Sequence, residues 1–291
     1  MNAIVAGSLD KLYANGVHAL KGISLEIEAG QIYGFLGPNG SGKTTTVRLL
    51  NGTLTPTGGR ALVLGLPPDD DSVRRRTSTL AELARMYDSL TIVDNLTFYA
   101  RLYGLDEGSI SRKIHELLNL LGLWEKRDLK LGSFSTGMQK RVHLARVLIN
   151  SPEVVFLDEP TSGLDPESAL HVTELIRSLA QERGCTVFMC THNLALAERI
   201  CDLFGFIHEG MLVASGTREG LEREMVGKKE VLIRTATGEH RLPITAESEI
   251  NSHLTRLIDE GELVVGVAVE RPSLEAIYFH YIRKNAGEAH Q

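Results

Sequence analysis

The sequence predicts an α/β fold with a parallel sheet at its core, followed by a small α+β module. Two observations lead to this class. Short apolar runs, such as Val154 to Leu157 and Thr186 to Cys190, have the composition of strands buried on both faces, and helical patterns separate them. After about Gly220 the pattern changes to a hairpin, a helix, a strand and a last helix, so we expect one domain over 1–220 and a second over 221–291.

The first elements lead into a glycine-rich loop. Ile23 to Leu36 predicts two strands broken by a turn at Glu28-Ala29-Gly30, and the second strand ends directly in GPNGSGKT. Thr44 to Leu50 carries apolar residues at helical spacing, and Gly52 is a suitable stop. The predicted order is strand, glycine loop, helix.

The stretch that follows has helical patterns. Thr91 with Asp94 forms a capping box, Ser109 can cap ISRKIHELLNLL, and Gly137 opens MQKRVHLARVLIN. We interpret about 83–150 as a helical subdomain.

The remaining sequence predicts a helix, a hairpin and a last helix. Pro166 to Arg183 predicts a helix with proline at its first position. The segment KKEVLIRTATGEHRLPI predicts a hairpin that turns at Thr237-Gly238. The last helix places four apolar residues on one face, which indicates packing against a core: Leu274, Ile277, Tyr278 and Tyr281.

Composition limits the classes of protein that this chain can be. Its 291 residues allow one large core, or one core with an appendage. A net charge of −6 disfavours binding of nucleic acid through a broad positively charged surface, so we expect no nucleic-acid partner. No stretch approaches the ~20 apolar residues that span a bilayer, and the N-terminus has no signal-peptide pattern, which predicts a cytoplasmic protein.

Neither the cysteines nor the densest basic run predicts a site. Cys185, Cys190 and Cys201 are odd in number and lack CxxC spacing, which disfavours a disulfide framework or a zinc site. Cys185 and Cys190 flank an apolar strand and are interpreted as packing residues. The run Arg74 to Arg76 is interpreted as solvated surface in preference to a polyanion site.

The strongest chemical signal is a loop that fits GxxxxGK[ST]: Gly37, Pro38, Asn39, Gly40, Ser41, Gly42, Lys43 and Thr44. Its glycines let backbone N–H groups turn toward an anion, and the following helix offers its positive end. Lys43 can reach the β- and γ-phosphates of ATP, Thr44 can ligand Mg²⁺, and Thr45 completes the predicted ATP-binding set. A glycine-rich loop can also be a simple turn, but the strand before it and the helix after it favour phosphate binding.

Two acids, Asp158 and Glu159, end the buried strand VVFL. Burying two carboxylates costs free energy unless a cation or hydrogen bonds compensate them. The Mg²⁺ of a nucleotide supplies such a cation, so we expect Asp158 to face the metal and Glu159 to polarise the attacking water. The alternative, in which the acids cap the next helix, is weaker because that helix starts later, at Pro166.

Three further motifs make a family resemblance specific. In order and spacing, the loop and the acidic strand, together with Ser135-Thr136-Gly137-Met138-Gln139, Ser162-Gly163-Leu164-Asp165 and His192, resemble the nucleotide-binding domain of ATP-binding-cassette (ABC) transporters over about 1–220. The resemblance implies a P-loop NTPase fold with a parallel sheet core and an N-terminal antiparallel β portion. It also implies an ATP- and Mg²⁺-dependent ATPase that acts as a homodimer or heterodimer and drives an integral membrane permease, which would hold it at the inner face of the cell membrane.

The resemblance assigns roles to residues that are ambiguous alone. Ser135 and Gly137 would contact the γ-phosphate of the ATP held by the opposite subunit, and His192, with Lys43 and Glu159, would complete the catalytic set. Asp165 matches the family's D-loop, which communicates across the dimer. Tyr13 corresponds to the aromatic residue that stacks on adenine. The plain alternatives are N-caps for Ser135 and Asp165, a structural role for His192 and a core position for Tyr13.

Two positions depart from the family pattern. Where a Q-loop glutamine is common, counting back from Tyr87 reaches Glu82, so a carboxylate would approach the nucleotide and its metal and strengthen Mg²⁺ dependence. The signature reads STGMQ instead of SGGQ. Both departures, and the ending that begins at Arg271-Pro272-Ser273, resemble ATP-binding subunits of bacterial drug and antibiotic exporters.

Two other functions stay open at the level of sequence. A soluble ABC ATPase that acts on nucleic acid or ribosomes is disfavoured by the acidic net charge and by the lack of a long heptad insertion. A catalytically weak nucleotide-binding regulator is suggested by Glu82 and the altered signature. The intact Lys43, Asp158, Glu159 and His192 count against that second alternative.

Overall fold

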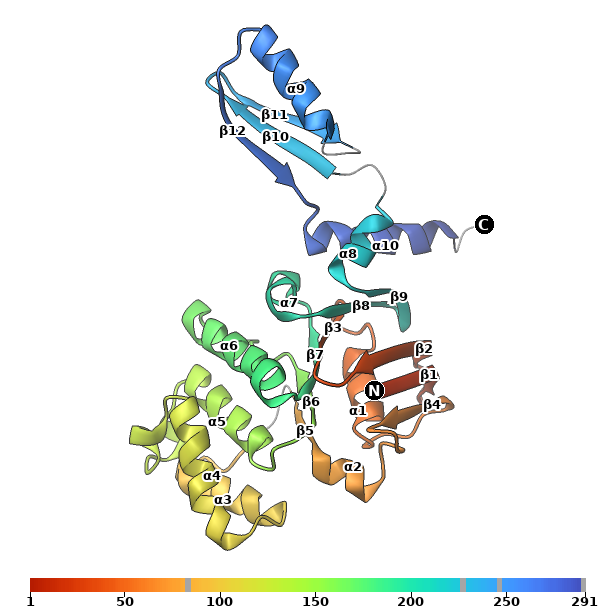
Figure 1. Ribbon diagram of the computed structural model, residues 1–291. Helices are drawn as coiled ribbons and strands as arrows, with labels where there is room; N and C mark the ends of the chain where they lie inside the picture. The colour runs from red at the N-terminus through yellow and green to blue at the C-terminus, as the bar shows by residue number, and fades with distance from the viewer. Residues whose placement is uncertain (82–84, 226–228, 245–247, 289–291) are drawn as a thin grey trace. The chain divides into compact units, whose positions relative to one another are not determined.

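The computed structural model describes residues 1–81, 85–225, 229–244 and 248–288. The chain divides into two compact units, Met1–Ser215 and Gly216–Gln291 (Figure 1). The division falls after Ser215, whereas the sequence predicted a boundary after residue 220. None of the described helices is long and apolar enough to cross a membrane.

A six-stranded sheet forms the centre of the first unit, in the order β5-β6-β7-β3-β8-β9. The pairs among the first five strands are parallel. This confirms the predicted parallel core, and burial on both faces explains the continuous apolar sequences of the inner strands. The strands are β3 (Ile32–Leu36), β5 (Thr77–Leu80), β6 (Val154–Asp158), β7 (Thr186–Thr191), β8 (Leu203–His208) and β9 (Met211–Gly216).

Helices connect these strands. The predicted order of strand, glycine loop and helix is confirmed, because α1 begins at Lys43 directly after the loop. Pro166 is the first residue of α6, as predicted, and Asp165 caps that helix. The connecting helices are α1 (Lys43–Leu50), α2 (Asp71–Arg76), α6 (Pro166–Arg183) and α7 (Leu194–Ile200).

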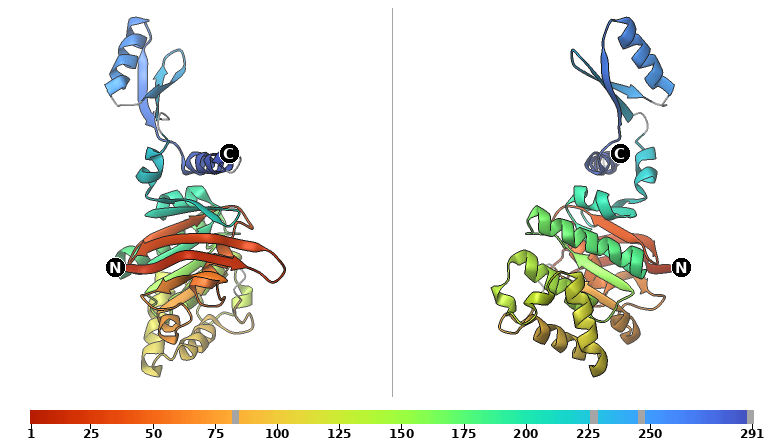
Figure 2. Two further views of the ribbon diagram at one scale, coloured as in Figure 1. Left: turned by 90° about the vertical axis from the view of Figure 1, so that its right-hand side faces the viewer. Right: turned by 60° about the vertical axis from the view of Figure 1, so that its left-hand side comes forward.

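A second, antiparallel sheet covers the start of the chain, with the order β2-β1-β4. Figure 2 shows its first two strands running side by side in red. The predicted N-terminal antiparallel portion is therefore confirmed. Its strands are β1 (Asn2–Leu12), β2 (His18–Glu28) and β4 (Gly58–Val63).

The helical subdomain contains α3 (Ile92–Leu102), α4 (Glu107–Leu120) and α5 (Thr136–Leu148), with two short 3₁₀ turns at Trp124–Lys126 and Leu131–Ser133. Thr91 caps α3, since its hydroxyl accepts from the amide of Asp94 at 3.0 Å, as predicted.

The prediction that Ser109 caps α4 is wrong. Asp106 already has the extended backbone of an N-cap, so the helix begins at Glu107. The Ser109 hydroxyl lies inside the first turn and donates to the carbonyl of Asp106 at 2.7 Å. Similarly, α5 begins at Thr136 with Ser135 as its cap, which places Gly137 within the helix.

The second unit holds a three-stranded antiparallel sheet in the order β11-β10-β12. The predicted hairpin is confirmed, because Thr235 donates its amide to the carbonyl of Gly238 at 2.8 Å at the turn. The predicted packing face of the last helix is also confirmed, since all four of its apolar residues are buried. The elements are α8 (Arg218–Arg223), β10 (Lys229–Thr235), β11 (Glu239–Ile244), α9 (Ser248–Asp259), β12 (Val264–Glu270) and α10 (Leu274–Glu288).

Candidate functional site

The glycine loop between β3 and α1 is tightly confined. A Cβ atom on Gly37 would collide with the carbonyl oxygen of Ile207, and one on Gly42 would lie 2.7 Å from the carbonyl oxygen of Ala19. Gly42 also has a φ of +113°, which disfavours other residues. The hydroxyl of Ser41 is buried and has no hydrogen-bond partner among the described residues. The loop is therefore a close-fitting cradle that keeps one polar group unsatisfied.

Lys43 is a buried cation at the start of α1. Its side chain is 6% exposed, and its ammonium donates to the carbonyls of Gly37 at 2.7 Å and Pro38 at 3.1 Å. The same ammonium lies 3.9 Å from a carboxylate oxygen of Glu159. A cation buried beside loop carbonyls and one carboxylate is suited to hold an anion.

Thr44 and Asp158 meet across the gap between α1 and β6. The Thr44 hydroxyl donates to the Asp158 carboxylate at 2.9 Å. Hydroxyl and carboxylate oxygens are ligands that suit Mg²⁺, which is usually held by one or two protein groups together with water and phosphate. The residues present thus fit a nucleotide-bound Mg²⁺.

Glu159 occupies a strained position at the end of β6. Its φ is +47°, in the left-handed region, and such strain is often found where a side chain must be aimed at a site. Its buried carboxylate accepts from the hydroxyl of Thr191 at 3.1 Å and the amide of His192 at 3.0 Å, and it lies 2.7 Å from Nδ1 of His192. Its backbone carbonyl accepts from the ammonium of Lys140 at 3.1 Å. Hydrogen bonds therefore fix both the carboxylate and the backbone carbonyl of Glu159.

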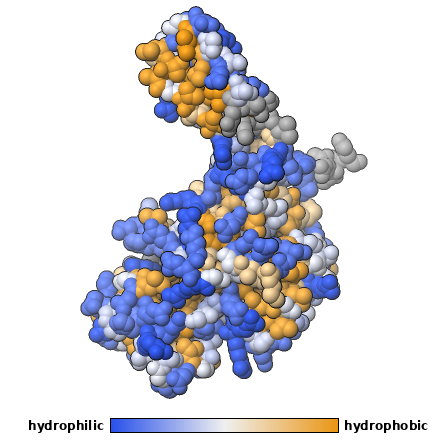
Figure 3. All heavy atoms as spheres, in the orientation of Figure 1, coloured by the Kyte–Doolittle hydropathy of each residue, from blue (hydrophilic) through white to orange (hydrophobic). Residues whose placement is uncertain are grey.

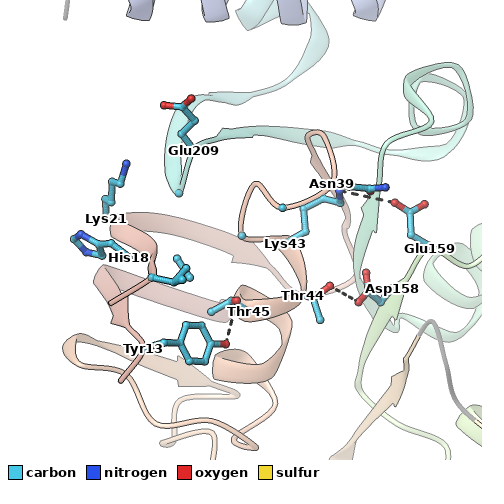
Figure 4. Close-up of a pocket in the computed structure, with 15 residues that line it drawn as sticks. Tyr13, His18, Lys21, Asn39, Lys43, Thr44, Thr45, Asp158, Glu159 and Glu209 are labelled. Atoms are coloured by element: carbon cyan, nitrogen blue, oxygen red, sulfur yellow. Dashed lines mark hydrogen bonds and ion pairs between the residues drawn. The ribbon is translucent and has the colours of Figure 1, made fainter. Parts of the chain in front are cut away.

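Lys43, Thr44, Asp158 and Glu159 line one side of a pocket of about 540 Å³ (Figure 4). Tyr13 lies on the other side, where its hydroxyl and that of Thr45 are 3.3 Å apart. The pocket brings together nine of the predicted residues: Tyr13, Asn39, Gly40, Gly42, Lys43, Thr44, Thr45, Asp158 and Glu159.

Six further residues line this pocket that the sequence did not predict there. Val17 precedes β2, His18, Ala19 and Lys21 lie in β2, and Glu209 and Gly210 form the turn between β8 and β9. Gly210 donates its amide to the carbonyl of Ser41 at 3.0 Å, which places this turn against the glycine loop. No local motif marks these residues, because only the pairing of distant strands brings them to the loop.

Other predicted residues lie outside the pocket. Ser135 caps α5, accepting from the amide of Met138 at 3.3 Å, and Asp165 caps α6, accepting from the amide of Ser168 at 2.9 Å. Hydrogen bonds from Ser168 hold the pKa of Asp165 below its usual value. Both N-cap interpretations are thus confirmed.

Gly137 and His192 have distinct surroundings. A Cβ atom on Gly137 would lie 2.5 Å from the hydroxyl of Ser168, so α5 passes close to α6 at this residue. The side chain of His192 is 58% exposed and reaches the site through its contact with Glu159. Glu82 lies outside the described residues.

The three cysteines are free thiols. Cys185 and Cys190 are buried, which confirms their interpretation as packing residues, and the three thiols form no disulfide within the described chain. Burial raises the pKa of Cys185 to about 12, and it also raises the pKa of Cys190 and of Cys201.

Comparison with known proteins gives consistent matches. A family model described as "ABC transporter" matches residues 20–162. An ABC transporter ATP-binding protein of Synechocystis sp. is 34% identical over 97% of this chain and 85% of its own length. The daunorubicin/doxorubicin resistance ATP-binding protein of Streptomyces peucetius is 38% identical over 77% of this chain and 68% of its own length. A solved dimeric cassette of a bacterial ABC transporter has a TM-score of 0.67 and 25% identity, covering 74% of this chain and 98% of that one.

Proposed function

The chain belongs to the ABC transporter ATP-binding family, and we propose that it binds ATP with Mg²⁺ in the pocket between α1, β2 and β6 and hydrolyses it to drive a membrane permease. The observation that carries this proposal is the group of Lys43, Asp158 and Glu159, all three buried beside the glycine loop, with the exposed Thr44 donating its hydroxyl to Asp158. A cation and two carboxylates in one small volume are costly to bury without a ligand that uses them.

Each part of the pocket has a place in this proposal. The cradle of Gly37 to Gly42 and the ammonium of Lys43 would hold the phosphates, and Tyr13 would stack on the base. Thr44 and Asp158 would hold Mg²⁺, which neutralises charge on the phosphates when it is bound. The unsatisfied hydroxyl of Ser41 supports a loop that is completed by its ligand.

Glu159 is the proposed general base. Its carboxylate is held by Thr191 and His192 and faces the ammonium of Lys43, so it is oriented before substrate arrives. From that position it would orient the attacking water and accept its proton. His192, exposed and in contact with Glu159, would contact the terminal phosphate.

A second ATP-binding subunit would complete each site. Ser135 and Gly137 stand at the start of α5, outside the pocket of their own chain, where the amides of a helix start form an anion site. We propose that they contact the γ-phosphate bound by the opposite subunit, and that Asp165 lies at the same junction. The dimeric cassette among the structural relatives supports this arrangement. The partner would be a second copy or a related subunit.

The permease is proposed to dock on the helical subdomain. Tyr87 and Phe98 are 49% and 42% exposed and their rings contact edge to face, with centroids 5.3 Å apart. Such an exposed aromatic pair suits a protein partner. We propose that this contact holds the chain at the inner face of the cell membrane. The resistance protein of Streptomyces peucetius supports an exporter.

Nucleotide binding by Lys43→Ala tests the proposal. Removing the ammonium should weaken ATP binding by about 2–5 kcal/mol, because a buried charge loses its partner. Isothermal titration with Mg-ATP measures this, and Lys126→Ala, which removes a lysine of the helical subdomain, is the control. Equal ATP binding by Lys43→Ala and the unmodified protein would refute the proposed site.

The dimer is tested separately with Glu159→Gln. This variant should bind Mg-ATP, hydrolyse it slowly and elute as a dimer in size-exclusion chromatography. A monomer that retains bound ATP would argue against the proposed role of Ser135 and Gly137. Glu82→Gln should keep appreciable ATPase activity at saturating Mg²⁺, and complete loss would give that carboxylate a more essential role than Mg²⁺ dependence.

A further inference from the structure

Hydrogen bonds fix both the side chain and the backbone of Tyr13, the residue proposed to stack on the base. Its hydroxyl lies 3.3 Å from that of Thr45, which follows Thr44 on α1 (Figure 4). Its backbone amide donates to the carbonyl of Val17 at 2.9 Å, which closes the turn between β1 and β2. The ring is therefore tied to the helix that carries the proposed phosphate-binding residues.

The face of this ring makes a contact to which the proposed function gives no role. The ammonium of Lys11 lies over the Tyr13 ring, 5.5 Å from its centroid. A cation within about 6 Å of a ring centroid is attracted by the electrons of the ring face. The same ammonium donates to the carbonyl of Thr55 at 2.7 Å, in the loop between α1 and β4. Lys11 thus bridges the ring and a backbone carbonyl.

The loop that anchors Lys11 is itself fixed to the end of β1. Thr57 donates its amide to the carbonyl of Asp10 at 3.0 Å and its hydroxyl to the carboxylate of Asp10 at 2.9 Å. The Thr57 hydroxyl also accepts from the amide of Leu12 at 2.9 Å. These bonds lie on either side of Lys11 in the sequence, so they set the position of its ammonium between Thr55 and the ring.

Lys11 acts on the ring from outside the pocket. Among the described residues that line the pocket, Tyr13 is present and Lys11 is not. The ammonium therefore covers one part of the ring, and Tyr13 presents another part to the pocket. A ring whose orientation is already fixed loses less freedom when a base stacks on it, and preorganisation of this kind increases affinity.

We propose that Lys11 is a positioning residue for nucleotide binding, which fixes the Tyr13 ring in the orientation that stacks on the base of ATP. The inference rests on the proposed function, because it requires ATP in the pocket with its base beside Tyr13. It goes beyond that function by assigning a residue that does not line the pocket. The plain alternative is that Lys11 only fastens the loop at Thr55, which predicts no effect that depends on the base.

Two ligands distinguish these roles when the full-length chain carries Lys11→Met. Isothermal titration with Mg-ATP should show an affinity about two- to fivefold lower than that of the unmodified protein, as expected for the loss of one cation–ring contact. Titration with magnesium and inorganic tripolyphosphate, which has the phosphates but no base, should show no change. A variant that is damaged in folding, or in charge near the phosphates, would bind both ligands more weakly.

Two further variants serve as rescue and control. Lys11→Arg should keep most of the ATP affinity, because a guanidinium also binds the face of an aromatic ring. Arg60→Met removes a positive charge from β4, the strand that pairs with β1 in the same sheet, and should leave both affinities unchanged.

A double-mutant cycle tests whether Lys11 acts through Tyr13. Tyr13→Leu should weaken ATP binding at least fivefold, since base–aromatic stacking is lost. In that background Lys11→Met should cause no further loss, because the ring that it positions is gone. The cycle requires no measurable binding of tripolyphosphate.

Three outcomes would overturn the role of Lys11. They are unchanged ATP affinity in Lys11→Met, an equal loss of affinity for ATP and tripolyphosphate, and a loss that persists in the Tyr13→Leu background. The proposed ATPase site would still stand in each case if the unmodified protein binds ATP and Lys43→Ala binds it weakly. Failure of the unmodified protein to bind ATP would overturn both proposals.

Discussion

The two units of the chain depart from ordinary burial in opposite directions. The first unit buries charged groups, with Lys43, Asp158 and Glu159 all buried beside the carboxyl end of a parallel sheet. The second unit exposes apolar groups, with the valines of β12 left uncovered at the edge of an antiparallel sheet. Buried charges and exposed apolar strips are the informative exceptions in a folded protein. The first exception indicates chemistry, whereas the second leaves an apolar strip exposed on the strand, in the unit where Figure 3 shows apolar residues gathered.

The largest expected effect tests the chemical half of this comparison. Glu159→Gln should lower ATP turnover by about 10²–10⁴-fold, because an amide cannot accept the proton of the attacking water. Phosphate release at saturating Mg-ATP measures the rate. Glu153→Gln is the matched control, since Glu153 precedes the same strand but is exposed and pairs with Arg76 at 2.6 Å. If Glu159→Gln turned over ATP as fast as Glu153→Gln, the buried carboxylate would not be the base.

A core substitution tests whether the two units are separate in energy as well as in structure. Ile233→Ala should destabilise the second unit by about 2–5 kcal/mol, because a fully buried side chain is removed from a small core. Hydrogen exchange should become faster in β10, β11 and β12 and stay unchanged in β3, β6 and β7. Val265→Ala, at an exposed site, should change stability by less than about 0.5 kcal/mol. Equal acceleration in both sheets would show that they unfold together.

Substitution of Lys140 tests whether its hydrogen bond orients Glu159, the residue with the strained backbone. Lys140→Met removes the hydrogen bond to the backbone carbonyl of Glu159, and a bond of this charged type contributes about 1.5–3 kcal/mol. We expect kcat to fall by roughly tenfold with little change in KM, since the loss concerns orientation of the base. Lys140→Arg should restore part of the rate. A rise in KM at constant kcat would instead place Lys140 in nucleotide binding.

The smallest expected effect concerns the pH dependence of stability. Burial, with help from Arg146 and Lys140, lowers the pKa of His143 from 6.5 to about 4. Between these values the unfolded chain binds a proton at this residue and the folded chain does not, so the stability present above pH 6.5 is lost as the pH falls toward 4. Urea unfolding of His143→Gln at pH 7 and pH 5 should show a smaller decrease than the unmodified protein. An unchanged decrease would assign the acid sensitivity to other groups.

The local order of the chain was enough to predict the central chemistry. The glycine loop lies between a buried strand and a helix, and the two acids end another buried strand. The carboxyl ends of parallel strands meet at one edge of a sheet, so Lys43, Thr44, Asp158 and Glu159 had to come together once the sheet was parallel. The hairpin at Gly238 and the packing face of α10 were also predictable, because turn residues and helical spacing are local signals.

Tertiary structure alone decided the rest. It brought His18, Lys21 and Glu209 to the pocket, because strand order and the pairing of distant segments are long-range properties. It placed Ser135 and Asp165 outside that pocket as helix caps, although in the sequence Ser135 stands between the glycine loop and the acidic strand and Asp165 follows soon after Glu159. It also decided that β11 and β12 are the edge strands of the second sheet. The alternation of residues along β12 would be the same at the centre of a sheet, and only the neighbours of a strand determine which of its backbone groups and side chains are left for a partner.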